Sequence, residues 1–447
     1  MTSQSLSRQS ITTYEQAVDY LLNVPKFTAK NSIEDTRKYL HFLGDPDSKL
    51  HIIHVAGTNG KGSVCAYLRS VLESAGYTTA VFTSPHLVDI RERFVIRGQM
   101  IEKEEFLRAF LTVYNSLDWE ALEKGQGYHP TFFEYLFFIA MILFAGAGVD
   151  YCILETGLGG RLDATNSVAH KKLSVITRIS LDHVEYLGDT VEQIAGEKAG
   201  IMQKGAPVVF ADTEEVVSNV FCRHAEELGI SAYPVSKNDY AFLTFQNKSI
   251  DFSVRTRYYG YIRLTLRTQA RYQMENAALA VRAIEVLNQG KTISAQHIIQ
   301  GIASCFWQGR MEEVLPDVYV DGAHNEDGIR AFLESVAADG CKGKRKLLFG
   351  VVQDKDYVHM LKELQESGLF CRIAVAHLKT GRSATLESLR KLLENGNTKQ
   401  AVCEYTFHDS ADTALAELLK EQKPGERIYI AGSLYLVGEI KEFLKHD

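Results

Sequence analysis

A glycine-rich turn that carries a lysine constrains the fold of this chain more than any other feature. Residues 57–63 read GTNGKGS, between a short apolar run at residues 50–56 and a segment with helical periodicity at residues 64–75. Glycines let backbone N–H groups converge on an anion, and a helix N-terminus and the Lys61 ammonium add positive charge. The pattern predicts a phosphate-binding loop between a buried strand and a helix, and therefore an α/β fold.

The loop departs from the common phosphate-loop pattern GxxxxGK[ST] at two positions. That pattern would have glycine in place of Val55 and serine or threonine in place of Gly62. The alternative is a strand–helix turn without a ligand, but a lysine inside a glycine-rich turn has little structural use. Phosphate contacts are therefore expected from Gly57, Thr58, Asn59, Gly60, Lys61, Gly62 and Ser63.

Short apolar runs alternate with helical segments, which predicts a mostly parallel sheet covered on both faces. Between residues 240 and 267 the segments become short and alternating, as in a small antiparallel sheet. Helices are expected at residues 191–203, 270–287 and 294–304, and further strands at residues 77–83, 149–155, 173–179 and 207–210.

A second α/β alternation begins after residue 311. Its strands are expected near residues 318–321, 346–352, 371–376, 401–407 and 427–431. The length of 447 residues suits two or three domains. We expect an α/β phosphate-loop domain with a mostly parallel sheet and a small antiparallel sheet at residues 1–307, then a smaller Rossmann-like domain at residues 308–447.

Composition and charge exclude several classes of protein. Hydrophobic residues make up 45% of the chain and charged residues 23%, as in ordinary globular proteins. The formal net charge of −7 argues against broad nucleic-acid binding, which needs a basic face. The most apolar run, residues 132–147, is short for a bilayer span and contains Glu134, so a buried helix is expected there.

The cellular compartment follows from the cysteines and the start of the chain. The seven cysteines are scattered and form no CxxC pair, which favours a reducing compartment over a disulfide framework or a zinc site. The polar start, MTSQSLSRQS, lacks the apolar stretch of a signal peptide. We expect a cytoplasmic monomer that binds neither membranes nor nucleic acid.

Further motifs follow the glycine-rich loop in a fixed order, and together they carry a family resemblance. The set resembles the folylpolyglutamate synthase and dihydrofolate synthase branch of the Mur-type amide ligases over nearly the whole chain. The motifs are TSPHL (83–87), ETGLGGRLDATN (155–166), LDH (181–183), EKAGI (197–201), ENAALA (275–280), GRME (309–312), DGAHN (321–325) and GSLYLVGE (432–439).

The resemblance implies a reaction in which ATP phosphorylates a folate-type carboxylate and the amino group of L-glutamate attacks the acyl phosphate. Phosphoryl transfer depends mostly on positioning and charge neutralisation, so Mg²⁺ is expected beside ATP. A monovalent cation is compatible with the resemblance. The pteridine substrate is expected to be a folate, with dihydropteroate as a second candidate.

The resemblance assigns Mg²⁺ to Ser84, Glu155 and His183. Glu155 ends an apolar run and opens a glycine loop, as expected of a carboxylate at the carboxyl edge of a parallel sheet. The structural alternatives are a salt-bridged acid for Glu155, a hydrogen-bonded histidine for His183 and a turn serine for Ser84, which precedes a proline.

Other residues take catalytic roles by the same resemblance. Lys198 resembles a lysine that becomes carbamylated; by itself it would be a solvated helix lysine. Arg310, in the segment between the domains, is expected to reach the phosphates when the domains close. Asn276 is expected near the adenine, Asp321 near the ribose and His324 near the incoming glutamate; a linker arginine and a helix N-terminal histidine are the structural alternatives.

Two segments are expected to bind the pteridine substrate. Plain core packing is the alternative for Phe132 and Phe133, whereas Glu134 needs a polar partner wherever it is buried. An exposed ion pair is the alternative for Arg161 and Asp163. The predicted contacts are Thr131, Phe132, Phe133 and Glu134 in the first segment, and Arg161, Leu162, Asp163 and Ala164 in the second.

Two other activities remain open from the sequence. One is a Mur-type ligase that acts on a cell-wall nucleotide precursor, against which GTNGKGS, LDATN, TSPHL and DGAHN favour the folate branch. The other is an ATP-binding switch that uses nucleotide for a change of shape. A phosphate-loop ATPase coupled to nucleic acid is opposed by the acidic balance of charges.

Overall fold

The computed structural model describes residues 8–24, 31–289, 292–395 and 403–446, and its first sheet has eight strands. Their order is β4-β3-β2-β5-β1-β6-β7-β8. β3 and β4 run antiparallel, and the others pair in parallel, as predicted. The strands are β1 Ile52–Ala56, β2 Thr79–Phe82, β3 Phe94–Ile96, β4 Gln99–Met100, β5 Tyr151–Glu155, β6 Leu173–Ile176, β7 Val208–Ala211 and β8 Ala232–Val235.

Helices cover both faces of this sheet because its strands are apolar on both sides. α3 (Lys61–Ser74), α10 (Gln273–Asn288) and α11 (Ala295–Ser304) share one hydrophobic cluster with it. The helices on the opposite face form two clusters. They are α1 Tyr14–Asn23, α2 Ile33–Phe42, α4 Lys103–Asn115, α5 Trp119–Glu123, α6 Phe132–Ala147, α7 Val184–Leu187, α8 Val191–Ala199 and α9 Glu215–Leu228.

Two further sheets complete the fold. β9 (Tyr240–Gln246), β10 (Ser249–Arg255) and β11 (Tyr261–Leu266) form the predicted antiparallel sheet. The third sheet has the order β12-β13-β17-β14-β15-β16, and its strands pair in parallel except for β12. They are β12 Glu312–Leu315, β13 Val318–Val320, β14 Arg345–Phe349, β15 Arg372–Ala376, β16 Glu404–His408 and β17 Arg427–Ala431.

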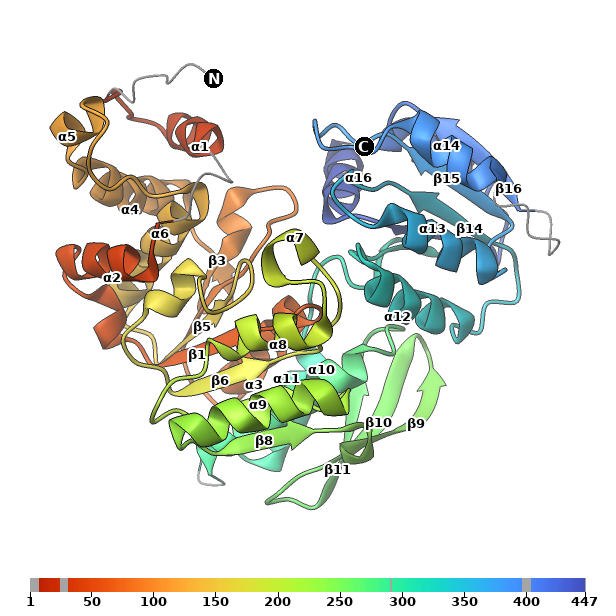
Figure 1. The fold of residues 1–447 in the computed structure, drawn as a ribbon. Coiled ribbons are helices and arrows are strands. Elements are labelled where there is room, and N and C mark those ends of the chain that lie inside the picture. The colour runs from red at the N-terminus through yellow and green to blue at the C-terminus, as the bar shows by residue number, and fades with distance from the viewer. Residues whose placement is uncertain (1–7, 25–30, 290–291, 396–402, 447) are drawn as a thin grey trace.

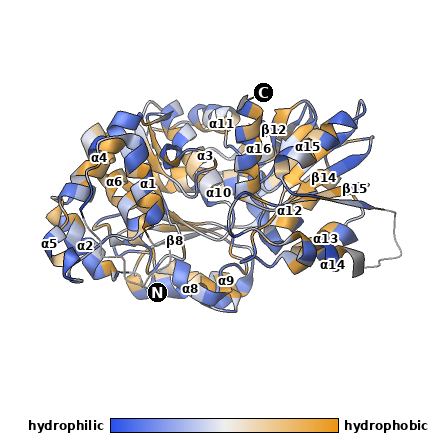
Figure 2. Cartoon of the chain, turned by 90° about the horizontal axis from the view of Figure 1, so that it is seen from above, coloured by the Kyte–Doolittle hydropathy of each residue, from blue (hydrophilic) through white to orange (hydrophobic). Residues whose placement is uncertain are grey.

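The third sheet also carries helices on both faces and forms a second body beside the first (Figure 1). Figure 2 shows hydrophobic residues along the strands and hydrophilic residues on the outer faces of the helices. These features confirm the two-part α/β fold, whereas a division at residue 307 stays a prediction. The helices are α12 Glu326–Ala337, α13 Tyr357–Glu366, α14 Leu386–Asn395, α15 Ala411–Lys420 and α16 Leu434–His446.

Several boundaries differ from the expected ones for local reasons. The helix expected to reach residue 203 ends at Ala199, before a glycine at position 200. The strand expected at residues 401–407 begins at Glu404, and residues 401 and 402 lie outside the described part. Of the helices in the described ranges, none has both the length and the apolar character needed to cross a bilayer.

Candidate active site

The glycine-rich loop joins β1 to α3, at the carboxyl edge of the first sheet. Thr58 N–H donates to the carbonyl of Arg178 (2.9 Å), and the Thr177 hydroxyl donates to the carbonyl of Asn59 (2.7 Å). Gly60 has φ +91°, and a Cβ atom there would lie 2.2 Å from Asn276 Oδ1. Only glycine fits such a close approach in the left-handed region, so Asn276 and the segment after β6 fix the loop.

Two lysines converge on the first residue of this loop. Lys61 Nζ donates to the carbonyl oxygens of Gly57 (3.1 Å) and Thr58 (3.2 Å). Lys198 Nζ, from α8, donates to the same Gly57 carbonyl at 2.8 Å. Lys198 is only 4% exposed, and burial, assisted by the nearby Lys61 charge, lowers the pKa of its ammonium to about 7. The sequence-based alternative of a solvated helix lysine is therefore wrong.

Glu155 lies at the end of β5, next to β1, and is 3% exposed. Its Oε2 accepts a hydrogen bond from the backbone N–H of Ser84 at 3.0 Å. Burial raises the pKa of the Glu155 carboxyl, and the Lys61 charge opposes this effect most strongly. One hydrogen bond leaves this carboxylate with free acceptor capacity, and such a group in a cleft is a suitable ligand for a hard cation.

His183 caps the start of α7 with a φ of +50°. Burial lowers the pKa of its imidazole to about 4, so the ring is neutral at pH 7. A neutral imidazole keeps a lone pair that a metal can use. Ser84, Glu155 and His183 all line the same cavity, but no group of three or more His, Cys, Asp or Glu side chains suited to a metal occurs in the described ranges.

Asp182, next to His183, forms a contact between the two bodies. It forms a 2.5 Å ion pair with Lys355 of the second body and lies 3.7 Å from His324 Nε2. Burial raises the pKa of the Asp182 carboxyl, but the Lys355 ammonium and the neighbouring histidines outweigh it and hold the pKa below its usual value. Asp182 belongs to the LDH motif, from which no role was predicted for it.

A second set of contacts links the loop itself to the second body. Asn59 Nδ2 donates to Asp327 Oδ2 at 2.7 Å, and Asn325 Nδ2 donates to Asn59 Oδ1 at 3.1 Å. Arg178 bridges Asp327 of one body and Glu275 of the other, each at 3.2 Å. A residue of the glycine-rich loop therefore contacts the second body directly.

Arg310 and Asp321 lie where the chain passes between the bodies. Asp321 is 2% exposed, and its oxygens accept from the Tyr272 hydroxyl (2.6 Å) and from the N–H groups of Met311 (3.0 Å) and Ala323 (2.8 Å). Burial raises the pKa of the Asp321 carboxyl, opposed chiefly by Arg310. These three hydrogen bonds fix Asp321 within the segment that connects the two bodies. A contact between Asp321 and the ribose stays a prediction.

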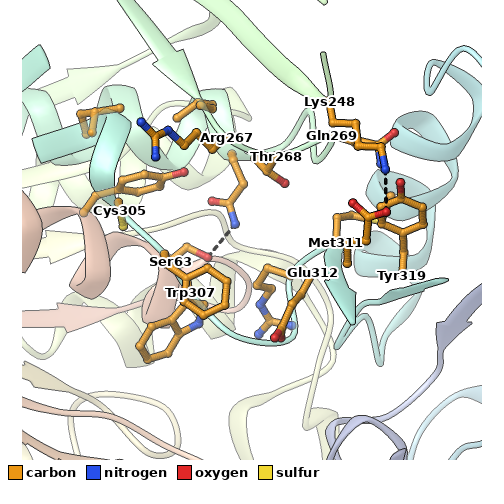
Figure 3. A pocket seen from close by; sticks show the side chains of 17 residues that line it. Ser63, Lys248, Arg267, Thr268, Gln269, Cys305, Trp307, Met311, Glu312 and Tyr319 are labelled. Atoms are coloured by element: carbon orange, nitrogen blue, oxygen red, sulfur yellow. Dashed lines mark hydrogen bonds and ion pairs between the residues drawn. The ribbon is translucent and has the colours of Figure 1, made fainter. Parts of the chain in front are cut away.

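The bodies enclose a cavity of about 780 Å³ that is lined from both sides. Figure 3 shows a smaller cavity of about 280 Å³. Ser63 and Arg310 line both cavities. In the smaller cavity Gln273 Nε2 donates to Ser63 Oγ at 3.0 Å, and Trp307 packs against Gly62. The larger cavity brings together the predicted residues Gly57, Thr58, Asn59, Gly60, Lys61, Gly62, Ser63, Ser84, Glu155, His183, Lys198, Asn276, Arg310, Asp321 and His324.

The start of α6 satisfies its own polar groups. Thr131 is the N-cap, and Glu134 accepts from Thr131 N–H (2.7 Å), Asn31 Nδ2 (2.7 Å) and the Thr36 hydroxyl (3.1 Å). Glu134 therefore has the partners that its burial requires. Phe133 packs against Phe82, with ring centroids 5.7 Å apart, and both Phe132 and Phe133 contribute to the hydrophobic core. A pterin contact from this segment therefore stays a prediction.

The segment 161–164 lies outside the lining of the large cavity. Asp163 Oδ2 accepts from the N–H groups of Gly157 (2.9 Å) and Leu158 (2.8 Å), so it shapes the glycine loop after Glu155. Arg161 pairs with Glu197 at 2.5 Å on the surface, Leu162 is 53% exposed, and Ala164 is buried. Their predicted substrate contacts stay untested. Arg161 forms an exposed ion pair with Glu197, whereas Asp163 is buried and is not part of an exposed pair.

Two protein-family models match the chain. The Mur ligase middle domain matches residues 55–284, and the Mur ligase glutamate ligase domain matches residues 309–434. Among curated relatives, a dihydrofolate synthase/folylpolyglutamate synthase of Bacillus subtilis is 33% identical over 97% of this chain and all of its own length. A folylpolyglutamate synthase of Lacticaseibacillus casei is 30% identical over 96% of this chain and 98% of its own length.

Solved structures show the same fold. E. coli FolC in complex with DHPP and ADP superimposes with a TM-score of 0.82 and 29% identity, over 98% of this chain and 99% of that one. The apo form of L. casei FPGS gives a TM-score of 0.83 and 26% identity, over 97% of this chain and 100% of that one. The similarity therefore extends over both bodies.

Proposed function

Because the chain belongs to the Mur ligase family, in the group of folylpolyglutamate and dihydrofolate synthases, we propose that it joins L-glutamate to the carboxylate of a folate at the expense of ATP. One observation carries the proposal. Lys61 on the glycine-rich loop, Glu155 at the sheet edge and Arg310 at the hinge all line one cavity between the two bodies. The cavity can hold a triphosphate next to the carboxylate that it activates, with the Lys61 and Arg310 charges neutralising the negative charge of both groups.

ATP is proposed to lie along the glycine-rich loop with its base in the smaller cavity. Asn276, which was expected near the adenine, lines the larger cavity and is joined to the smaller one by its hydrogen bond to Gln273 Oε1 at 3.0 Å. That cavity opens beside Ser63 and offers the Trp307 ring together with the carboxamides of Gln269 and Gln273 (Figure 3). Aromatic rings and carboxamides suit the stacking and hydrogen bonding of a purine. Arg310 borders both cavities, which fits contact with the phosphates.

Ser84, Glu155 and His183 are proposed to hold Mg²⁺. The donor set is compatible with that ion, because Glu155 Oε1 has no hydrogen-bond partner among the residues described and the His183 ring is neutral. Bound there, the ion would supply positive charge to the phosphates. The residues themselves position the carboxylate: Ser84 N–H orients Glu155, and Asp182 orients the segment that bears His183.

Lys198 is proposed to carry a carbamate. An amine with a pKa near 7 is about half neutral at pH 7 and mostly neutral at pH 8, and a neutral amine can react with CO₂. Because Lys198 Nζ lies beside the Gly57 carbonyl, the carbamate would be next to the glycine-rich loop, where the phosphates of ATP are proposed to bind. A monovalent cation remains an additional expectation from the resemblance.

The incoming glutamate is proposed to bind on the second body. Lys355, Arg382 and Ser433 line the cavity there and can meet carboxylates. His324 Nδ1–H donates to the Gly322 carbonyl at 2.8 Å, which leaves Nε2 with a lone pair toward the glutamate ammonium. We propose a cytoplasmic monomer, and the seven free thiols fit a reducing compartment.

The decisive experiment offers the purified protein ATP, Mg²⁺ and L-glutamate with dihydropteroate or tetrahydrofolate separately, and measures products by mass spectrometry. Product from both substrates is expected, which would make the enzyme bifunctional. The Lys61→Ala variant is the control that should lose product with both. ATP binding by the wild-type protein without product from either substrate would favour the switch alternative and contradict the proposal.

A further inference from the structure

Arg93 is a buried guanidinium with few protein partners. It ends the 3₁₀ turn Ile90–Arg93 before β3, and it is only 6% exposed. Its Nε donates to His86 Nδ1 at 2.8 Å. The terminal nitrogens Nη1 and Nη2 have no acceptor among the residues that the structure describes, although a buried charge ordinarily requires one.

The sheet register places Arg93 beside the active site. Phe94 pairs with Phe82 and Phe82 pairs with Leu154, so Arg93 and Glu155 occupy the same row at the carboxyl edge. Since strands lie about 4.8 Å apart, their backbones are roughly 10 Å apart across β2. The guanidinium carbon lies 5.7 Å from the centre of the Phe132 ring. Arg93 therefore lies beside the aromatic start of α6 and in the same row of the sheet edge as Glu155.

The chemistry of this position selects a planar anion. A guanidinium presents parallel N–H groups that match a carboxylate, and a ring beside it suits a flat aromatic acid. The phosphates of ATP have a separate cationic site at Lys61 and the glycine-rich loop. The large cavity is lined by Glu155 and Tyr435, whose charges act on Arg93, although Arg93 itself is not part of its lining. We infer that Arg93 binds a carboxylate of the pteridine substrate beside Glu155 and so selects acids there, an inference that rests on the proposed function.

A purely structural role as a counter-charge for Glu155 is less consistent with the surroundings. Lys61 and Arg310 both lower the pKa of the Glu155 carboxyl more than Arg93 does. Burial lowers the pKa of Arg93 itself to about 10, and the charges of Glu155, Tyr435 and Glu92 oppose this effect without overcoming it. The guanidinium therefore feels these groups at a distance but makes no hydrogen bond to a carboxylate of the residues described. An incoming carboxylate would supply the missing partner.

The test measures equilibrium binding of pteroate and of its carboxamide, without ATP or Mg²⁺, by ligand fluorescence. The wild-type protein should bind the acid about 10- to 100-fold more tightly than the amide. Arg93→Gln should reduce that ratio to near one, and Arg93→Lys should restore part of it. Arg91→Gln is the matched control, because Arg91 lies in the same turn and is already paired with Asp89 at 2.8 Å.

Turnover identifies which carboxylate is bound. Dihydropteroate has one carboxylate, the reacting one, whereas tetrahydrofolate also carries an α-carboxylate. A raised KM for both substrates in Arg93→Gln indicates the reacting group, and a raised KM for tetrahydrofolate alone indicates the α-carboxylate.

Equal wild-type affinity for pteroate and its amide would overturn the inference even if no variant folds. So would an unchanged ratio in a folded Arg93→Gln protein. Absence of product from the wild-type protein would instead contradict the proposed function, while the binding ratio would still report on Arg93.

Discussion

The Nζ atom of Lys198 lies 2.8 Å from the carbonyl oxygen of Gly57, the residue that opens the glycine-rich loop. This contact joins α8 to the loop across 141 positions of sequence. Lys61 donates to the same carbonyl, so two cations share one acceptor in a buried place. Burial, together with the smaller effect of the nearby Lys61 charge, favours a neutral Lys198 and lowers its pKa to about 7.

Carbamate on Lys198 is expected to increase with pH through about 7, because only the neutral amine reacts. In the unfolded chain the amine keeps its proton to about pH 10.5. The folded state therefore binds fewer protons between pH 7 and 10.5, and the contribution of Lys198 to stability rises with pH across that window. Native mass spectrometry with and without CO₂ at pH 6 and pH 8 measures the adduct.

The Lys198→Ala variant is expected to lose activity by about 100-fold or more. Lys204→Ala is the control, since Lys204 is an exposed lysine five residues after the helix ends. Full activity of Lys198→Ala, or an intact mass without the adduct at pH 8 under CO₂, would contradict the proposed carbamate.

Glu155→Gln is expected to raise the Mg²⁺ concentration needed for half-maximal activity by more than about tenfold. Burial raises the pKa of Glu155, so the folded state binds more protons than the unfolded state just above the usual carboxyl pKa. Stability therefore falls as pH rises through that range, and the variant should be at least as stable as the wild type at pH 7. Thermal unfolding and Mg²⁺ titration check both effects, and an unchanged Mg²⁺ requirement would remove Glu155 from the metal site.

Asp163→Ala is expected to destabilise the fold by about 1–3 kcal/mol, because the N–H groups of Gly157 and Leu158 lose a buried acceptor. Arg161→Ala, at the exposed ion pair, should change stability by less than about 0.5 kcal/mol. Urea unfolding separates the two. A stable Asp163→Ala protein with a raised KM for the pteridine substrate would instead support direct substrate contact.

Gly438→Ala is expected to disturb closure of the two bodies. A Cβ atom at Gly438 of α16 would lie 2.3 Å from the carbonyl oxygen of Leu87, three residues after Ser84. The backbone of the 83–87 segment would have to shift, which should raise the KM for glutamate and lower kcat while each body stays folded. Small-angle scattering and steady-state kinetics measure this, and unchanged scattering with unchanged kinetics would show that the contact does not set closure.

Local patterns in the sequence identified most of the fold and the centre of the site. Periodicity and turn residues act over a few positions of the chain. They therefore predict the glycine-rich loop, the strand that ends at Glu155 and the small antiparallel sheet. The short strands β3 and β4 and the amino-terminal helices were not predicted. Their local signals are weak, and they are stabilised by packing against α6 and the sheet edge.

The sequence by itself determined the α/β class, the phosphate loop and the acid at the sheet edge, since each depends on residues that are adjacent in the chain. Only the tertiary structure decided that Lys198 is buried beside Gly57, that Asp163 shapes a loop, and that Asp182 pairs with Lys355. These facts depend on desolvation and on contacts between segments that are far apart in the chain. Such contacts exist only once the sheet and the two bodies have packed together.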